Sequence, residues 1–481
     1  MFDSEKSIAE AQMQFNRMEL YVRGEGQSHD SYTVERRLFK EALTMCLHLM
    51  KAYFDEKRGG DVGATIRTRE GQELPRERLK PRQFVCVFGE LELARYYYHE
   101  DGESGVYPLD EETRLPERSY SYYVQELLGQ RVARMTYEEA MAEMEQLFGF
   151  SPWKHSVEDM AAEAGESVDD YHQNEPAPAP ESEEEILVTA IDGKGVPIVK
   201  DEPAEHKVRL GRGEKRSRKK EATVAAVYTI APYERTVEDI IGELRDNQPA
   251  PRRPQPQNKH LRATLSGKDN GIAWVAEEMA RRDPDGRKRR ACLMDGSKGL
   301  WTVALARLGG CTFILDLFHV LEYLWKAAYV FHAEGSAEAE EFVRHRLRML
   351  LTGNVGYVIG GLRQMLSKHQ GLSKGQRRTV ENVIHYYESN RKWMRYDEYI
   401  AAGFPIGSGA VEGACRHLVK DRMEGSGMRW TVPGAESVLK LRAVYLNGQW
   451  NTFWVYHMQR QWQERYGHRR WQVADTVLKA G

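Results

Sequence analysis

The sequence has few cysteines and no long apolar run. Its 481 residues include five cysteines, and no two of them form a Cys-x-x-Cys pair. Such scattered thiols argue against a disulfide framework and against a cysteine-based structural zinc site. No apolar stretch reaches the roughly 18 residues of a membrane span, and the first residues are too charged for a secretory signal. We therefore expect a cytoplasmic protein with no membrane partner.

Basic residues are missing from one acidic segment. Between Glu158 and Glu185 there are 11 acidic residues and no Lys or Arg. The net charge of the whole chain is −3, so the chain outside these 11 charges carries about +8, a balance that suits a nucleic-acid partner. The segment is also poor in apolar residues, which predicts an unfolded linker at 158–185 between two domains.

The region before this segment, residues 1–157, is expected to be mainly helical with a small β-hairpin. Apolar residues recur at helical spacing within 5–57, and the run from Phe84 to Tyr98 is strand-like, with Asp101-Gly102 as a candidate turn. A Thr-x-x-Glu capping box starts a further helix at Thr136. Helices on both sides of Gly149 suit a DNA-reading helix-turn-helix, although most such helix pairs bind nothing.

Three short strings after the linker place an acidic residue beside glycine. They are Ile-Asp-Gly-Lys-Gly around Asp192, Leu-Met-Asp-Gly-Ser around Asp295, and Gly-Ser-Gly-Ala-Val-Glu-Gly around Glu412. The first two end apolar, strand-like runs, the third opens a helix-like segment, and Asp316 closes one more apolar run. This pattern predicts an α/β domain with a mixed sheet flanked by helices and with acids at its strand ends.

We assign the first part of this domain to 186–319 and an all-helical insertion to 320–404, because the latter range is almost entirely helix-like. Residues 405–481 then hold the helix of the third acid and a basic, aromatic C-terminal region.

Carboxylates that converge from strand ends and a helix could bind divalent cations. Hard cations prefer carboxylate oxygens, and two Mg²⁺ (or Mn²⁺) ions activate the attacking oxygen and stabilise the leaving oxygen in phosphodiester chemistry. The acid pattern therefore predicts a metal-dependent enzyme that processes DNA, with Asp192, Asp295 and Glu412 as catalytic metal ligands. Any one acid beside glycine is weak evidence, since turns and caps use the same residues.

Basic and aromatic residues near these acids are candidates for DNA contact. Eight Lys or Arg fall within 207–220, and Arg416 and Lys420 follow Glu412 at helical spacing. Trp430 could stack on a base or pack in the core. The predicted DNA-binding residues are Lys215, Arg216, Arg218, Lys219, Lys220, Arg416, Lys420, Arg429 and Trp430. Solvated hairpin and helix faces are the alternative for the charged ones.

Several strings together resemble bacterial insertion-sequence transposases of the Kra type, which are DDE transposases allied to the Mutator-like branch. They are Asp192-Gly-Lys-Gly-Val-Pro, Lys220-Glu-Ala-Thr-Val, Arg282-Asp-Pro, Leu293-Met-Asp-Gly, Leu315-Asp-Leu-Phe-His-Val-Leu-Glu-Tyr-Leu-Trp, Gly407-Ser-Gly-Ala-Val-Glu-Gly-Ala-Cys and Gly427-Met-Arg-Trp. The resemblance spans about 186–450 and is looser before it.

The resemblance implies an RNase H-like core that cleaves double-stranded DNA at transposon ends and joins the freed 3'-hydroxyl to target DNA. It implies a homo-oligomer on paired ends, in the bacterial cytoplasm with the nucleoid. Asp192 is then the first acid and Glu412 the last. In an RNase H-like order the second acid ends the fourth strand, which selects Asp295 and leaves Asp316 as the alternative. Asp316 and His319 resemble the supporting Asp-x-x-His of Mutator-like relatives.

Two other functions stay open at this stage. The chain could be a DNA-binding protein of transposase origin that has lost catalysis, or an RNase H-like nuclease without strand transfer. The presence of all three acids argues against the first of these.

Overall fold

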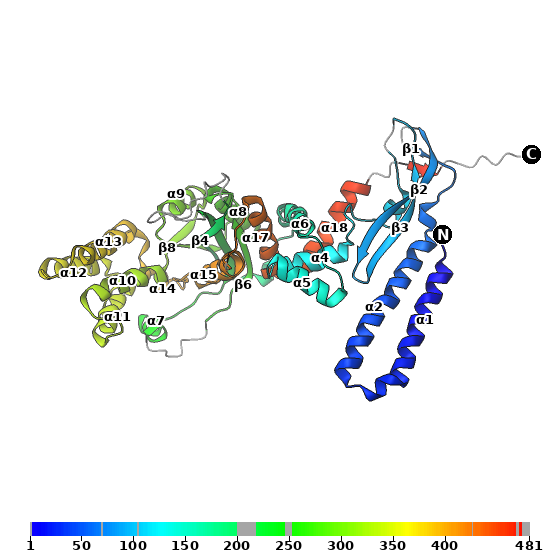
Figure 1. Cartoon of the computed structure of the whole chain (residues 1–481). Coiled ribbons are helices and arrows are strands. Elements are labelled where there is room, and N and C mark those ends of the chain that lie inside the picture. The colour runs from blue at the N-terminus through cyan, green and yellow to red at the C-terminus, as the bar shows by residue number, and fades with distance from the viewer. Residues whose placement is uncertain are drawn as a thin grey trace, which may run out of the picture. The chain divides into compact units, whose positions relative to one another are not determined.

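The computed structural model describes residues 2–68, 71–102, 105–199, 218–245, 253–425, 427–467 and 471–473. The chain forms two compact units, one of Met1–Gln173 with Gln449–Gly481 and the other of Asn174–Gly448 (Figure 1). Among the described residues, no helix combines the length and apolar character that crossing a membrane requires.

The first unit begins with two paired helices, α1 (Ser4–Arg23) and α2 (Ser31–Glu56), which confirm the helices expected within 5–57. Each starts at an aspartate, since the carboxylates of Asp3 and Asp30 accept from backbone N–H groups of the first turn. Such N-caps satisfy amide groups that have no partner within the helix.

A four-stranded sheet follows, in the order β3-β2-β1-β9. Its strands are β1 (Thr65–Thr68), β2 (Glu73–Cys86), β3 (Gly89–Tyr98) and β9 (Trp471–Val473). The expected β-hairpin is present, but its turn is not at Asp101-Gly102, because the chain already reverses between Cys86 and Gly89. Gly89 has a φ of 136°, a conformation that side chains disfavour, and it lets two apolar residues form the turn.

Helices complete the first unit: α3 (Pro108–Glu112), α4 (Tyr122–Val132), α5 (Tyr137–Phe148), α6 (Lys154–Asn174) and α18 (Trp450–Tyr466). The capping box at Thr136 and Glu139 is present, and Gly149 ends α5 in the left-handed conformation with a φ of 77°. The C-terminal helix α18 belongs to this unit and not to the unit that contains the helix of the third acid.

Helix α6 covers much of the acidic stretch where we expected an unfolded linker. Its buried residues, among them Val157, Met160, Ala164, Val168 and Tyr171, recur at helical spacing. The acids lie mostly between them, so the charge count of the segment hid an amphipathic helix. The boundary between the two units falls at its end, and the predicted domain limits otherwise stay predictions.

The second unit contains a five-stranded mixed sheet in the order β6-β5-β4-β7-β8. The strands are β4 (Ile186–Ile198), β5 (Arg218–Ile230), β6 (Gln257–Thr264), β7 (Arg289–Met294) and β8 (Cys311–Leu315). Strand β5 runs antiparallel to both of its neighbours, while β7 is parallel to β4 and to β8. The apolar residues of β4, β7 and β8 form the core of this unit.

Helices flank this sheet, as the sequence predicts. Helix α8 (Lys268–Arg282) contacts β5 and β6, and α17 (Val432–Leu446) contacts β6. The short helix α15 (Gly409–Ala414) contacts β4 and β5 and continues into the π-helix η5 (Cys415–Lys420) and α16 (Asp421–Met423). Helix α9 (Lys298–Arg307) lies between β7 and β8 in the chain and contacts α8.

The chain between β8 and α15 is helical. It forms α10 (Leu317–Phe331), α11 (Ala337–Leu351), α12 (Val355–Lys368), α13 (Lys374–Asn390) and α14 (Tyr396–Ala401). Figure 1 shows α10 to α13 together at one end of this unit, where α7 (Val237–Arg245) also contacts α11.

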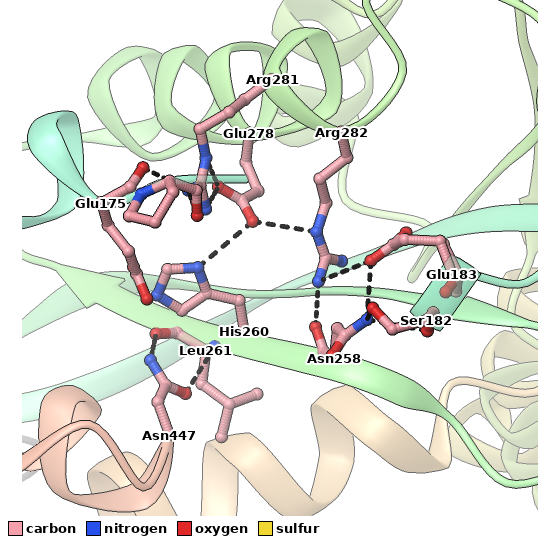
Figure 2. A network of polar contacts seen from close by, with 12 residues as sticks. Glu175, Ser182, Glu183, Asn258, His260, Leu261, Glu278, Arg281, Arg282 and Asn447 are labelled. Carbon is pink, nitrogen blue, oxygen red and sulfur yellow. Dashed lines mark hydrogen bonds and ion pairs between the residues drawn. The ribbon is translucent and has the colours of Figure 1, made fainter. Parts of the chain in front are cut away.

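A buried polar network joins residues 175–183, at the start of this unit, to β6 and α8 (Figure 2). Glu278 of α8 pairs with His260 of β6 and with Arg281 and Arg282 of its own helix. Arg282 also pairs with Glu183, and Arg281 donates to main-chain oxygens of Glu175 and Pro176. Burial opposes ionisation of Glu278, but the hydrogen bond and the positive charges outweigh it and lower its pKa to about 2.

Candidate functional site

Asp192 and Asp295 lie side by side on neighbouring parallel strands. Ile191 of β4 is paired with Met294 of β7; Asp192 is the next residue of β4, and Asp295 is the first residue after β7. Parallel strands in register carry such residues to the same level of the sheet. Both carboxylates are partly exposed. The two sequence-predicted acids therefore share one site, although they are 103 residues apart in the sequence.

Other carboxylates lie close to Asp295 and affect its pKa. Burial raises the pKa of Asp295, and the nearby carboxylates of Asp192 and Glu221 raise it further. A hydrogen bond from the backbone N–H of Ser297 to Oδ1, at 2.9 Å, and the charge of His319 act in the opposite direction. Acids that repel each other in this way favour a positive partner between them.

Asp316 occupies a different environment. It is 1% exposed and caps α10. Its Oδ1 accepts from the backbone N–H of Phe318 at 3.0 Å and of Ser408 at 3.2 Å, and its Oδ2 accepts from the Ser408 hydroxyl. His319 Nδ1 lies 3.1 Å from the same Oδ2. Protein donors therefore occupy both oxygens of Asp316.

His319 contacts Asp316 and interacts through its charge with Asp295 and Asp192. The hydrogen bond with Asp316 raises the pKa of His319 to about 9 against the effect of burial, and the charges of Asp316, Asp295 and Asp192 add to the rise. At neutral pH the imidazole is therefore protonated and donates to Asp316. The i, i+3 spacing predicted for this pair is confirmed as a contact.

Glu412 is exposed on α15, the helix that contacts β4 and β5. Three residues further on, the thiol of Cys415 donates to Oδ2 of Asp192 at 3.3 Å. This contact holds the helix of the third acid beside the strand of the first. Burial, and then the charge of Asp192, raise the pKa of the Cys415 thiol, so it stays protonated at neutral pH.

The predicted basic residues fall into three groups. Lys215 and Arg216 lie outside the described residues, as does the side chain of Arg218. Lys219 pairs with Glu424 at 2.6 Å. The remaining four, Lys220, Arg416, Lys420 and Arg429, are exposed.

The three residues expected to share a helical stripe, Glu412, Arg416 and Lys420, are all exposed, and the helix that carries them is not α-helical throughout. Residues Cys415–Lys420 form the π-helix η5, whose hydrogen bonds join residues five apart. The predicted stripe therefore stays a prediction. π-Helical turns are frequent at functional sites.

Trp430 packs in the core of this unit. It is 7% exposed, and its Nε1 donates to the carbonyl oxygen of Met423 at 3.1 Å. Its backbone also pairs with that of Pro197 and Val199 at the end of β4. Of the two roles open to Trp430 from the sequence, this burial favours packing over stacking on a base.

Sequence reasoning missed three side chains at this site. Ser408 and Cys415 lie in or beside the glycine-rich string around Glu412, but nothing marks them as partners of Asp316 and Asp192. Glu221 lies in the strand opposite β4 and pairs with Lys268 at 3.0 Å. Lys268 thereby brings a positive charge to the edge of the acid cluster.

Comparisons with known proteins are sparse. No protein-family model matches the chain. It is 21% identical over 393 residues to the UPF0236 protein in vanSb 3'region of Streptococcus gallolyticus, which covers 80% of this chain and 76% of that protein. Among solved structures it is similar to the Drosophila P element transposase strand transfer complex, at 10% identity and a TM-score of 0.22, over 73% of this chain and 82% of that one. A likeness this low carries no inference, so the site itself must support any function.

Proposed function

We propose that this chain is a DDE-type DNA transposase that binds insertion-sequence ends, cleaves them with divalent metal ions and joins the 3'-hydroxyl to target DNA. The observation that carries the proposal is the pair Asp192 and Asp295 at one level of neighbouring parallel strands, with the helix of Glu412 held beside Asp192. Carboxylates that converge from two strands and a helix are the arrangement that this chemistry needs.

The sheet supports an RNase H-like core in this proposal. Counted along the chain, the strands β4 to β8 take the spatial order 3-2-1-4-5, with only the second antiparallel. In that order the first and fourth strands are neighbours, as the first two acids require. The helices α10 to α14 are then the insertion between the fifth strand and the helix of the third acid. Within this proposal, the chain is a Kra-type transposase allied to the Mutator-like branch.

The donor groups fit Mg²⁺ or Mn²⁺. Asp192, Asp295 and Glu412 offer carboxylate oxygens, which hard cations prefer. The repulsion that raises the pKa of Asp295 would be relieved by a bound cation. The one sulfur beside them, that of Cys415, stays a thiol and is a poor ligand. When bound, two metal ions would activate the attacking oxygen and stabilise the leaving oxygen of the phosphodiester.

The environment of the two candidate second acids supports Asp295. A metal ligand needs free oxygen lone pairs, and Asp316 has both oxygens engaged by Phe318, Ser408 and His319. Asp295 is partly exposed and accepts one backbone hydrogen bond. In the proposal, Asp316 and protonated His319 are supports that fix α10 and the loop before α15.

DNA binding is assigned to groups in both units. The exposed Lys220, Arg416, Lys420 and Arg429 would contact phosphates around the acids. In the first unit, α5 and α6 on either side of Gly149 would act as a helix-turn-helix that binds the transposon end. We also propose assembly as a homo-oligomer on paired ends, in association with the bacterial nucleoid.

The test uses purified full-length chain and labelled DNA from the genomic segments that flank its coding region. With Mg²⁺ we expect strand cleavage at a defined end, and with pre-cleaved ends we expect joined products in a target plasmid. A matched incubation with Ca²⁺, which binds oxygen ligands with looser geometry, should allow binding with little cleavage.

The products separate the alternatives. Cleavage without joined products would identify a nuclease. Binding of the end without cleavage under Mg²⁺ or Mn²⁺ would identify a DNA-binding protein that has lost catalysis, and either result would overturn the proposal.

A further inference from the structure

A hollow of about 440 Å³ opens next to Asp295 within the second unit. It is bounded by the loop after β7 and by α9, α10 and α13. This volume is within the range of roughly 300–1,000 Å³ that holds small ligands. Its lining residues are Gly296, Lys298, Tyr323, Lys326, Thr379 and six more residues of α13. Because Gly296 directly follows Asp295, the hollow adjoins the acid site.

Gly296 and Tyr386 form the contact between the acid site and this hollow. A Cβ atom at position 296 would lie 2.2 Å from Cε2 of Tyr386, so only glycine lets the ring approach this closely. Burial raises the pKa of Tyr386, and the charges of Asp295 and Asp316 are among the further causes. The ring of Tyr386 thus lies against Gly296, the residue that follows Asp295, and the Tyr386 hydroxyl stays protonated.

The ring of Tyr386 is stacked on a second ring, but its hydroxyl has no hydrogen-bond partner in the part of the chain that the structure describes. Tyr323 of α10 stacks on it with 3.8 Å between ring centroids and an interplanar angle of 1°. The hydroxyl oxygen is buried and makes no hydrogen bond with the described residues. A buried hydroxyl without a partner costs stability, on the order of 1–3 kcal/mol, and such groups in native proteins usually await a ligand or water.

The charge of the hollow is opposite to that of the acid site beside it. Lys298 and Lys326 line it, and Nζ of Lys326 lies 4.2 Å from the centroid of the Tyr323 ring. None of the described residues that line it is acidic. The ammonium groups of Lys298 and Lys326 and the hydroxyl of Tyr386 are donors that suit a phosphate group, and they lie next to the acids proposed to bind metal ions.

We propose that this hollow binds the backbone phosphate of the DNA strand next to the phosphate that is cleaved, with Tyr386, Lys298 and Lys326 as its donors. The inference rests on the proposed function and adds a positioning site to it. Tyr386 acts here by holding the strand in register with Asp192 and Asp295, since an oriented substrate reacts faster than a loosely held one.

The experiment combines protein and DNA substitutions. Tyr386→Phe removes only the hydroxyl and keeps the stacked ring, and Tyr357→Phe, at an exposed site on α12, is the matched control. The end DNA carries a single neutral methylphosphonate at the linkage next to the cleavage point. We expect wild type to lose about tenfold in cleavage rate on this DNA, and Tyr386→Phe to lose about tenfold on ordinary DNA, each near 1.4 kcal/mol.

Non-additivity is the decisive readout. If the hydroxyl binds that phosphate, Tyr386→Phe loses little more on the methylphosphonate DNA, because the contact is already gone. Lys298→Met and Lys326→Met should each reduce the salt dependence of DNA affinity by about one phosphate contact, while Lys374→Met, at an exposed site outside the hollow, should not.

Failure of this inference is distinct from failure of the proposed function. If wild type cleaves DNA and the two losses simply multiply, or Tyr386→Phe behaves as wild type, the hollow does not bind this phosphate. If wild type cleaves no end DNA, the proposed transposase function is wrong. In that case, an unchanged salt dependence of DNA affinity in both lysine variants would show that the hollow does not bind a phosphate either.

Discussion

At the residue scale, two aspartates that look alike in the sequence have different surroundings. Asp295 and Asp316 both close an apolar strand, and no feature of the sequence shows which oxygens are free. The contacts of Asp316 with Ser408 join residues 92 positions apart, and that of Asp192 with Cys415 joins residues 223 apart. The presence of acids at strand ends could be predicted from the apolar runs, but their partners could not.

We predict that Asp316→Ala mainly destabilises the fold. The substitution leaves the donors of Phe318, Ser408 and His319 without their acceptor inside the protein, which should lower the free energy of unfolding by about 2–4 kcal/mol. Denaturant titration measures this change. Asp295→Ala is the matched comparison and should keep the wild-type midpoint within about 1 kcal/mol, because it loses one hydrogen bond at a partly exposed site. Equal destabilisation by both would contradict the different roles.

We predict that Trp430 supports the fold and that its neighbour Arg429 contacts DNA. Trp430→Phe loses the bond to Met423 and leaves a small cavity, so the free energy of unfolding should fall by about 1–3 kcal/mol, with unchanged salt dependence of DNA affinity. Arg429→Met should show the reverse, with the salt dependence reduced by about one phosphate contact. Packing alone predicts unchanged DNA affinity, whereas weaker DNA binding by Trp430→Phe at an unchanged salt dependence would reinstate base stacking.

At the element scale, one helix and one turn could not be predicted from the sequence. The helix is rich in acidic residues, and the turn is made of apolar ones. Helix α6 was hidden because its acids dominate the composition, while its buried stripe mixes small residues with larger apolar ones. The turn between β2 and β3 was hidden because it uses Val87 and Phe88, which are typical of strands. By contrast, the cap at Thr136 follows from local chemistry and was predicted correctly.

The contact between α6 and α18 predicts a pH dependence of stability in the first unit. His457 of α18 is 1% exposed, its Nδ1 lies 2.9 Å from the Ser167 hydroxyl, and burial, with the charge of Arg460, lowers its pKa from 6.5 to about 4. Between these values the unfolded chain binds the proton more readily, so stability is full above pH 6.5 and falls as the pH drops towards 4.

His457→Gln should remove this part of the pH dependence, which is on the order of 3 kcal/mol. Unfolding of both proteins is followed by urea titration from pH 7 to pH 4. His155→Gln is the control, because the His155 side chain is 96% exposed. Parallel pH profiles for wild type and His457→Gln would refute the assignment.

At the scale of the whole molecule, the acids come from three distant parts of the chain, two from the mixed sheet and one from the helix α15. The strand runs and the helical stretch after β8 follow from periodicity, but the strand order does not, because pairing joins residues far apart in the sequence. That order places Asp192 next to Asp295 and keeps Asp316 one strand further away. The proposed chemistry therefore depends on topology more than on any one string of residues.

The most direct test compares cleavage with binding in the acid variants. Asp192→Asn and Asp295→Asn keep the size of the side chain and lose its charge, so we predict DNA affinity at or above that of wild type and cleavage reduced by at least about 100-fold in Mg²⁺. Glu412→Gln should behave in the same way. Labelled end DNA serves for both readouts. Cleavage by Asp192→Asn or Asp295→Asn at the wild-type rate would contradict the proposed metal site and the transposase function built on it.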